Sequence, residues 1–531
     1  VYTYQVLSTA YGKFANSLKH SRRAAEFAVK QSEVIDAFLT DTITSDDSCI
    51  NALRDVETTN SVTTKGPSGM NADRAYSLDK RSYDASMLNV LGMSTGFAGN
   101  VGITRQTTIN ANITADGYVK QSDNTKENMN DANTLTATEA LVPLMSTHDD
   151  PMRTAMSFVQ TSKHSVRTEE SDPLLVTNGA DEAMAYMTTN RFAYKAAEDG
   201  IVVEATEDYI IIEYKSGKKA YINLRETIEK NSDGGYFEEL KLDPVEKLKI
   251  GSIVQPNQIV AYDKSSFSNS LGETDDIAFN IGKLAKVAIV NTDEAFEDSG
   301  IISKRLADQL ATKVNQKYDM ILDKETILYD IVKVGDHIEA GHPLMIWQAP
   351  FEDEDANALI RVLSDKEDVS ELGKRKLISE VTGTVSAIKI FRTVETDELS
   401  DSLKKLVVAY ERPYKQLFKK LQENKLDTSQ VPAHYVLPAV GKLKKAQDSI
   451  LIEIYVEYQD SIGIGDKIVY YSANKAVEKN IFPEGLEPYT DYRPTEQIGA
   501  LLGETSIMKR MVASINHIGT INKMVIELDR H

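Results

Sequence analysis

The sequence contains a single cysteine, Cys49, among 531 residues. No disulfide can form within the chain, and no zinc site built from several cysteines can be assembled from this chain alone. This cysteine usage fits a reducing compartment.

Long hydrophobic runs are also missing. No apolar run approaches the roughly 18 residues of a membrane-spanning helix, and the first thirty residues lack the apolar segment of a signal peptide. We therefore expect neither a membrane protein nor a secreted one. Hydrophobic residues make up 41% and charged residues 26% of the chain, which is typical of soluble folded proteins. At roughly 100 to 200 residues per domain, about three or four domains are expected.

Positive charge is scarce. The chain has 60 Lys and Arg against 80 Asp and Glu, a net charge of −20. A free-standing nucleic-acid-binding protein needs a basic face, so this balance argues against one. An assembly subunit is still allowed, because one concave side can concentrate Lys and Arg while the rest is acidic. The first residue is Val1, so either an initiator Met was removed or the chain begins part-way through an older domain layout.

The periodicity of apolar residues changes along the chain. Residues 5–56 and 138–165 have helical spacing, whereas residues 58–95 are rich in Gly, Ser, Asn and Asp and predict loops with polar contacts. From Gly200 short β-rich runs predict a meander, and a strand is expected again at 451–456.

Two further patterns concern turns and one helix. A strand, Gly-turn, strand form recurs around Gly251, Gly335 and Gly465, as in the tight turns of β-barrels. Residues 403–421 carry an apolar helical stripe, with Pro413 placed to start a second helix. The lysines of this stretch predict a solvated face: Lys404, Lys405, Lys415, Lys419 and Lys420.

Familiar catalytic motifs are absent. There is no Gly-rich phosphate loop followed by Lys-Ser/Thr, no paired-His metal helix and no Gly-x-Ser-x-Gly turn. Glu297 and Asp298 are adjacent carboxylates that could hold Mg²⁺ directly or through water, or could simply form the first turn of a helix. The sequence His148-Asp149-Asp150 likewise suggests a metal, but with Pro151 following it also fits a helix N-cap.

Several motifs occur in an order that resembles one family. The stretch 141–153 has an apolar lead, Pro, His-Asp-Asp and then Arg153, and 295–299 reads Ala-Phe-Glu-Asp-Ser. The stretch 381–385 reads Val-Thr-Gly-Thr-Val, and Gly465-Asp466-Lys467 is followed by Asn474-Lys475. Nearly the whole chain thus resembles, in collinear order, the C-terminal part of the β (second-largest) subunit of multisubunit DNA-dependent RNA polymerases.

Further matches lie outside these motifs. The stretch 79–82 is similar to part of the family's fork and rifamycin region, 99–103 to a later turn, and 502–511 to a Leu-Gly-x-Pro-Ser-Arg-Met motif with an insertion. Lys163 stands one position from where the family has a second basic residue after its Arg. The resemblance implies that these residues contact nucleic acid: Lys80, Arg81, Asn100, Arg105, Lys163, Lys509 and Arg510.

The chain also departs from the family. Tyr471-Ser472-Ala473 replaces the Arg-His-Gly between the two lysines, and an acid expected in a Thr-Pro-Glu-Gly turn is missing at Phe97. The three-Asp metal loop of the β′ subunit is absent, since Asn71-Ala72-Asp73 continues as Arg74-Ala75. A split β subunit without Arg-His-Gly resembles the polymerases of giant bacteriophages, whether packaged in the virion or not, more than the split subunits of some archaea.

The resemblance implies an α+β fold: a helical and loop-rich fork region, a double-psi β-barrel core and an inserted β-rich flap. The expected parts are a fork and rifamycin-pocket-like region (1–175), the first part of a hybrid-binding barrel core (176–309), a flap-like domain (310–448), and the second part of the core with the C-terminal segment (449–531).

The resemblance also implies roles for the matching residues. Arg153, Lys467 and Lys475 would hold nucleotide and RNA phosphates, because two fixed ammonium groups stabilise the charge that builds up during RNA 3′-end chemistry. Glu297 and Asp298 would tune a second Mg²⁺, directly or through water, with the main Mg²⁺ site on another chain.

The implied setting is the cytoplasm of an infected bacterium or the virion. Partners would be β′-like subunits with the Asp-triad loop, an N-terminal β-like subunit, DNA template, RNA product and a phage initiation factor, with no membrane. Two alternatives stay open: a β-rich virion structural or assembly protein, favoured by the acidity and the meander, and a polymerase-like scaffold that has lost catalysis.

Overall fold

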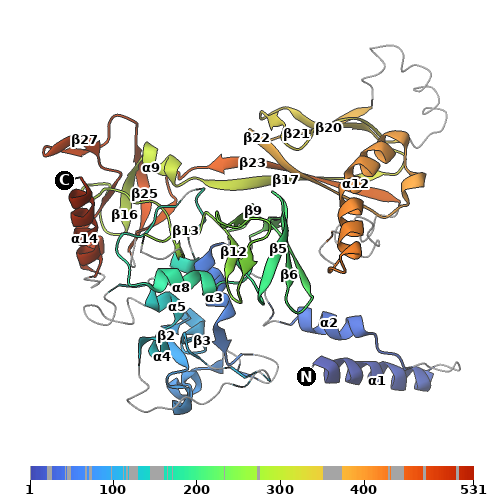
Figure 1. Cartoon of the computed structure of the whole chain (residues 1–531), viewed down its shortest axis with the longest axis horizontal. Coiled ribbons are helices and arrows are strands. Elements are labelled where there is room, and N and C mark those ends of the chain that lie inside the picture. The colour runs from blue at the N-terminus through green and yellow to red at the C-terminus, as the bar shows by residue number, and fades with distance from the viewer. Residues whose placement is uncertain are drawn as a thin grey trace, which may run out of the picture.

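The computed structural model describes residues 2–530 except 21–26, 42–43, 45–49, 66–68, 71–73, 97, 112, 115, 117, 119–129, 144–160, 164, 170, 232–233, 272–275, 351–372, 429–430, 432–447, 471–473 and 510–513. These residues form an α+β protein dominated by antiparallel strands, as expected. Figure 1 shows an elongated molecule, with a helical pair near the N-terminus beside the body and a sheet capped by helices near the C-terminus. No helix in these ranges is long and apolar enough to cross a membrane.

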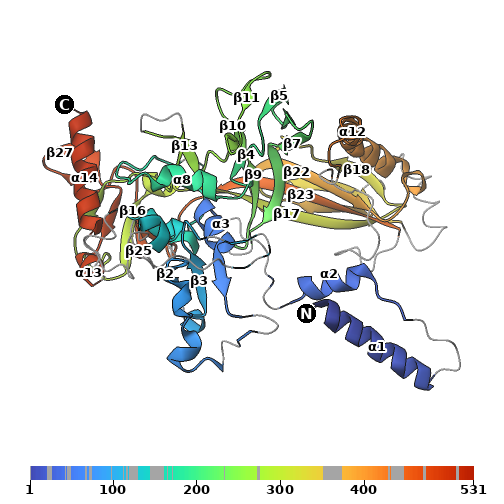
Figure 2. The same cartoon turned by 60° about the horizontal axis from the view of Figure 1, so that its bottom comes forward.

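The stretch 5–56, predicted to be helical, contains three helices. α1 (Tyr2–His20) and α2 (Gln31–Leu39) run antiparallel, since the Tyr2 ring contacts Phe38 at 5.5 Å and the Phe14 ring contacts Phe27 at 6.0 Å between centroids. α3 (Ala52–Thr59) belongs instead to the body, where Leu53 and Val56 are buried. Figures 1 and 2 both show α1 and α2 set apart from the body.

The region after α3 consists of short elements. The pattern over 58–95 predicted polar loops rather than core, but Ala75 and Val90 in this stretch are buried. The capping box of α5 anchors it: Thr136 accepts from the backbone of Glu139, and the Glu139 carboxylate accepts in return from the Thr136 N–H and from Ser94. The elements are β1 (Ser61–Thr63), η2 (Leu78–Arg81), β2 (Leu91–Thr95), β3 (Thr104–Thr107), α4 (Asp131–Thr134), α5 (Ala137–Ala140) and α8 (Ala180–Met187).

The meander predicted from Gly200 is confirmed. β5 (Gly200–Ala205), β6 (Tyr209–Tyr214) and β7 (Lys219–Asn223) pair antiparallel in sequence order. Their inward side chains are fully or almost fully buried: Val202, Ile210, Ile212 and Ile222. The strands that flank or follow this sheet are β4 (Ala193–Lys195), β8 (Arg225–Lys230), β9 (Phe237–Lys241), β10 (Asp243–Pro244), β11 (Ile253–Val254), β12 (Ile259–Tyr262), β13 (Phe267–Asn269) and β14 (Ile277–Phe279).

The three predicted glycine turns have left-handed backbone conformations. φ is +88° at Gly251, +95° at Gly335 and +98° at Gly465. A side chain with Cβ is strained in this region, so glycine is the natural residue at each turn.

The next structural unit along the chain is a long sheet. β17 (Thr312–Asp323) pairs with β23 (Ser449–Asp460) over all twelve residues, and β22 (Gly383–Arg392) pairs with the other edge of β23. This sheet crosses the boundary predicted at residue 448, and the proposed domain limits stay predictions. Smaller strands complete this end: β18 (Ile327–Ile331), β19 (His337–Ile338), β20 (Pro343–Gln348) and β21 (Lys374–Ile378).

One helix, α12 (Asp401–Glu423), covers a face of this long sheet. The prediction that Pro413 starts a second helix was wrong, because the helix runs straight through Pro413. Proline removes only one helical N–H, and burial of Leu403 and Val407 before Pro413 and of Leu421 after it holds the helix on both sides of that gap. The solvated-face prediction was also wrong for Lys420, which contacts Glu204 and the Tyr209 ring and so ties α12 to the meander.

A buried ion triad joins the segment before α8 to the sheets. Arg167 donates to Asp263 (Nη1–Oδ2, 3.0 Å) and pairs with Glu238 of β9 (Nη2–Oε2, 3.0 Å), and all three side chains are about nine-tenths buried or more. Burial alone would lower the pKa of Arg167, but the carboxylates of Asp263 and Glu238 raise it above its ordinary value. The guanidinium therefore stays charged and locks three distant segments together.

A separate five-stranded sheet, which mixes parallel and antiparallel pairs, has the strand order β15-β28-β16-β25-β24. Its strands come from two distant parts of the chain: β15 (Val287–Ile289), β16 (Ser299–Ser303), β24 (Lys467–Tyr470), β25 (Asn474–Phe482) and β28 (Ala500–Leu502). Among the described strands no sheet closes into a barrel, so the double-psi barrel stays a prediction. Around this sheet lie α9 (Lys304–Gln309), β26 (Tyr489–Thr490), β27 (Arg493–Gln497), α13 (Glu504–Met508) and α14 (Ser514–Asp529).

Candidate functional site

The hairpin β24–β25 places the two predicted lysines on one face. Lys467 pairs with Val477, and Val469 pairs with Lys475. Paired residues point to the same side of a sheet, and so do residues two apart on one strand. Lys467 and Lys475 are therefore diagonal neighbours on the same face.

The turn before Lys467 is built by local hydrogen bonds. The Asp466 carboxylate accepts from the Gly463 N–H (2.8 Å), and the Gly465 N–H donates to the Glu478 carbonyl (2.8 Å). The Gly-Asp-Lys motif thus fixes the position of Lys467 at the end of this turn, where β24 begins. Lys467 itself is exposed.

The adjacent carboxylates lie at the same end of this sheet. β16 runs parallel to β25, with Ser299 opposite Val477, and the Val477 N–H donates to the Asp298 carbonyl at 2.9 Å. Glu297 and Asp298 immediately precede β16, so they lie beside the part of β25 that carries Lys475. Two motifs about 170 residues apart in the sequence are therefore next to each other in space.

Glu297 has a rare backbone conformation. Its φ is +56°, a left-handed value that costs a non-glycine residue free energy and often occurs at functional positions. The surrounding loop fixes it: the Phe296 N–H donates to Ser299 Oγ (3.1 Å), and the Ser299 hydroxyl donates back to the Phe296 carbonyl (2.5 Å). The prediction that these acids form the first turn of a helix does not describe this loop.

The described part of the third family-like motif, 502–509, lies beside the loop that carries Glu297. A Cβ on Gly503 would lie 3.0 Å from the Ala295 carbonyl oxygen and 3.1 Å from Phe296 Cα, so the chain before α13 packs closely on this loop. At the end of α13, Lys509 Nζ lies 2.6 Å from Glu297 Oε1. The structure therefore places five predicted residues at one end of this sheet: Lys467, Lys475, Glu297, Asp298 and Lys509.

This site is open to solvent. The side chains of Lys509 and Glu297 are 61% and 54% exposed, and within the described ranges no group of three or more His, Cys, Asp or Glu is arranged to hold a metal ion. Mg²⁺ keeps several waters and commonly binds through one or two carboxylates. Glu297 and Asp298 provide two such carboxylates on one loop, and that of Glu297 is paired with Lys509.

Sequence reasoning missed a buried polar group behind the lysine face. Glu478 is fully buried on the opposite side of β25, and burial raises its pKa to about 7, although its contact with the Tyr470 hydroxyl lowers it. Within the described structure, Glu478 Oε2 has no hydrogen-bond partner. The strand alternation could have revealed it, because Glu478 has the same phase as the buried Ala476.

This buried carboxyl predicts a pH-dependent stability. The folded chain keeps Glu478 protonated up to about pH 7, whereas the ordinary value is 4.5. Its contribution to stability is therefore fully present below pH 4.5 and is lost as the pH rises through 7, by roughly 3 kcal/mol.

Thermal unfolding of the chain and of Glu478→Gln between pH 5 and pH 8 measures this effect. The melting temperature of the wild-type chain should fall more steeply with pH than that of the variant, which cannot ionise. Parallel pH profiles would show that Glu478 does not retain its proton in the folded chain.

The predicted nucleic-acid residues near the N-terminus have diverse environments. Arg81 donates to the backbone carbonyls of Gly99 (3.0 Å) and Val101 (2.7 Å), and Arg105 donates to the Gly92 carbonyl. Arg81 therefore braces the segment 99–101, and Arg105 of β3 binds the neighbouring strand β2. Lys80 is exposed, as is Asn100, which accepts from Lys65.

The other predicted residues divide into two groups. Lys163, in a helical turn over 161–163, lies 3.8 Å from Glu57 and is partly exposed. Several positions singled out in the sequence lie outside the described residues, and what was predicted for them stays a prediction. They are Arg153, Arg510, Phe97, the segment 471–473 and the His148-Asp149-Asp150 sequence.

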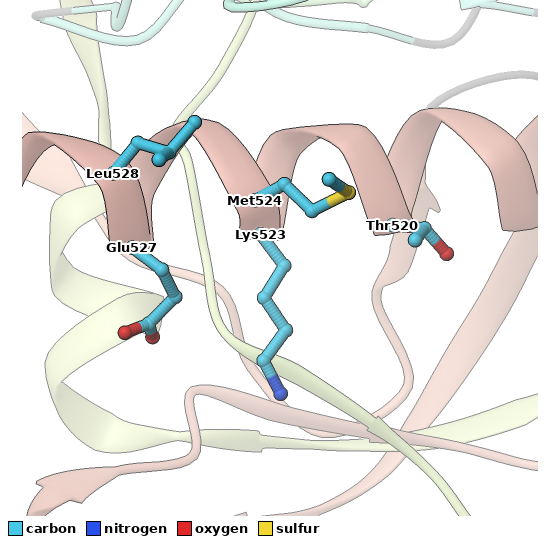
Figure 3. Close-up of a pocket in the computed structure, with 5 residues that line it drawn as sticks. All are labelled: Thr520, Lys523, Met524, Glu527 and Leu528. Atoms are coloured by element: carbon cyan, nitrogen blue, oxygen red, sulfur yellow. The ribbon is translucent and has the colours of Figure 1, made fainter.

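A shallow apolar hollow lies on α14, away from these side chains. Figure 3 shows Met524 and Leu528 on one side of the helix and Lys523 and Glu527 on another, with Thr520 at one end. It is lined by a single helix and has no cluster of polar groups that converge on a ligand. We do not place the functional site there.

Comparison with known proteins adds no assignment. No model of a known protein family matches the chain, and no curated protein sequence matches it. Its function is therefore argued from its own residues.

Proposed function

We propose that the chain is a subunit of a multisubunit DNA-dependent RNA polymerase of the giant-bacteriophage type, forming the β side of the active-site cleft. One observation carries the proposal: segments 295–299, 467–470, 474–475 and 503–509 meet at one end of the five-stranded sheet. These are the segments whose motifs resemble the family's nucleotide-handling residues. The proposal includes the finer expectation that this sheet belongs to a double-psi barrel.

In this proposal the lysines act as fixed positive charges. Lys467 and Lys475 share a face of a hydrogen-bonded hairpin, which would let both ammonium groups reach the same phosphates. Preorganised charges of this kind stabilise the negative charge that develops on phosphates during nucleotidyl transfer. Arg153 is proposed to add a further phosphate contact.

The carboxylates act on the metal side of the reaction. Glu297 and Asp298 would bind a second Mg²⁺, directly or through water. The bound ion would neutralise nucleotide phosphates. The main Mg²⁺ site would lie on a β′-like partner with three Asp residues. Glu297 and Lys509 are exposed in this chain. Because an active site must be shielded from water, this exposure supports a partner chain that covers the other side of the cleft.

The nucleic-acid contacts are proposed more narrowly than the sequence alone suggested. Exposed Lys80 is suited to a phosphate, whereas Arg81 and Arg105 hold backbone carbonyls and would shape the loops beside the RNA–DNA hybrid. The net charge of −20 supports an assembly in which partner chains supply much of the positive charge that binds nucleic-acid phosphates. The cytoplasm of an infected bacterium or the virion is the proposed location.

Extension of a primed RNA tests this function. The purified chain alone should not extend the primer, while a complex isolated through a tag on this chain should extend it in the presence of Mg²⁺ and template. Extension by the isolated chain, or an inactive complete complex, would contradict the proposal. The second outcome would favour a polymerase-like scaffold that has lost catalysis.

A further inference from the structure

The outer face of α12 carries a row of positive charges. The helix contains six Lys and Arg against three Asp and Glu, although the whole chain has a net charge of −20. Leu403 and Val407 are buried in the core of the long sheet. On the opposite side, exposed residues recur at intervals of three and four: Lys405, Val408, Arg412, Lys415 and Lys419. Residues with this spacing lie on one side of a helix, so the cations form a row about 21 Å long.

The described residues neutralise little of this row. Neither Lys405 nor Arg412 forms an ion pair with any of them. Lys415 Nζ lies 2.8 Å from a Glu411 carboxylate oxygen, but the same carboxylate also accepts from Arg392 Nε at 2.8 Å. One negative charge is thus shared by two cations, and the middle of the row stays positive.

The end of the row is also open to another molecule. Lys419 lies 3.9 Å from Glu423, and the two side chains are 78% and 65% exposed, so water screens this pair. Figures 1 and 2 both show α12 on the outside of the long sheet, at the end of the molecule opposite α14. A concentration of Lys and Arg on one side of an acidic protein favours an anionic partner there.

The residues in and beside the row indicate which anion fits. Val408 is the one apolar residue in the row, whereas a partner helix packs along a repeated apolar seam. Separate cations fit a chain of regularly spaced negative charges, such as a phosphodiester backbone. Phe418, three residues after Lys415 and next to Lys419, is 45% exposed. An exposed aromatic ring beside phosphate-binding cations suits a single strand, because its unpaired bases can stack on the ring.

We infer that the outer face of α12 binds single-stranded nucleic acid. Lys405, Arg412, Lys415 and Lys419 contact successive parts of the phosphate backbone, and a base stacks on Phe418. Phosphates and base faces are common to RNA and DNA, so the surface accepts either strand. The inference goes beyond the proposed polymerase function and does not require it, because the row and the ring are properties of α12 alone.

Fluorescence anisotropy of the full chain with a short, labelled single-stranded RNA tests the phosphate contacts. Lys405→Ala with Arg412→Ala should reduce the slope of log affinity against log salt concentration by about 1.4, since each contact to a single strand contributes about 0.7. The matched control, Lys218→Ala with Lys249→Ala, removes two exposed cations from turns of the meander sheet and should leave the slope unchanged. An unchanged slope in the α12 variant, equal changes in both pairs, or no binding at low salt would overturn the inference.

A second set of measurements separates single strands from other anions. Phe418→Ala should weaken RNA binding about tenfold, whereas Phe418→Tyr, which keeps a ring, should retain it. Single-stranded DNA of the same length should respond to both variants as RNA does, and duplex DNA should not respond to Phe418→Ala. RNA binding that ignores Phe418→Ala, or equal displacement of the RNA by polyglutamate of matched charge, would point to a surface for an acidic protein and overturn the inference.

Discussion

Replacing Lys467 or Lys475 by alanine in the assembled complex is expected to lower the rate of nucleotide addition about a hundredfold or more. This is the usual scale when one preorganised electrostatic group is removed from a transition state. Both side chains project from the same face of the β24–β25 hairpin, where their loss leaves the buried face of Ile468 and Ala476 intact. Single-turnover extension of a primed RNA measures the effect, and subunit composition after purification shows whether assembly survives.

Lys479 provides the matched control for the lysine pair. It is exposed on the same strand, four residues beyond Lys475, at a bulge in the pairing with β16. Lys479→Ala removes one positive charge but not a proposed phosphate contact, so nucleotide addition should stay near the wild-type rate. Equal losses for all three variants would indicate a general charge effect. Wild-type rates for Lys467→Ala and Lys475→Ala would mean that the site is misassigned.

Replacing Arg167 by methionine is expected to destabilise the chain by roughly 3 to 5 kcal/mol, the usual cost of leaving buried carboxylates unpaired. Glu238 and Asp263 would lose their common partner in a place with little access to water. Methionine keeps most of the apolar volume of the arginine stem, so the loss reports mainly on charge. Urea unfolding of the purified chain provides the measurement.

An exposed ion pair serves as the control for Arg167. Lys215 lies 3.0 Å from Asp199, and the two side chains are 77% and 42% exposed. Lys215→Met should change stability by only about 0 to 1 kcal/mol, because water already solvates both charges. Similar losses for Arg167→Met and Lys215→Met would show that the triad is not a buried structural lock.

Local features were the most predictable from sequence. Glycine turns and the meander depend on neighbouring residues, and both are present in the structure. The break at Pro413 was wrong because packing of α12 on the long sheet outweighs the loss of one helical hydrogen bond. Tertiary contact thus overrode a local signal.

The assembly of the site depended on a non-local pairing. Periodicity cannot show that β16 and β25 are parallel neighbours, since their segments are separated by about 170 residues. Only the order of family-like motifs suggested that Glu297, Asp298 and Lys475 belong together. The contact of Lys509 with Glu297 and the bracing contacts of Arg81 required side-chain geometry, because an exposed cation in a sequence pattern has many possible partners.

Native mass spectrometry of the complex isolated through this chain tests the central claim most directly. A polymerase subunit should bring with it a β′-like chain carrying the three-Asp metal loop and an N-terminal β-like chain, in fixed stoichiometry. A complex made only of copies of this chain, or one without the three-Asp loop, would contradict the account.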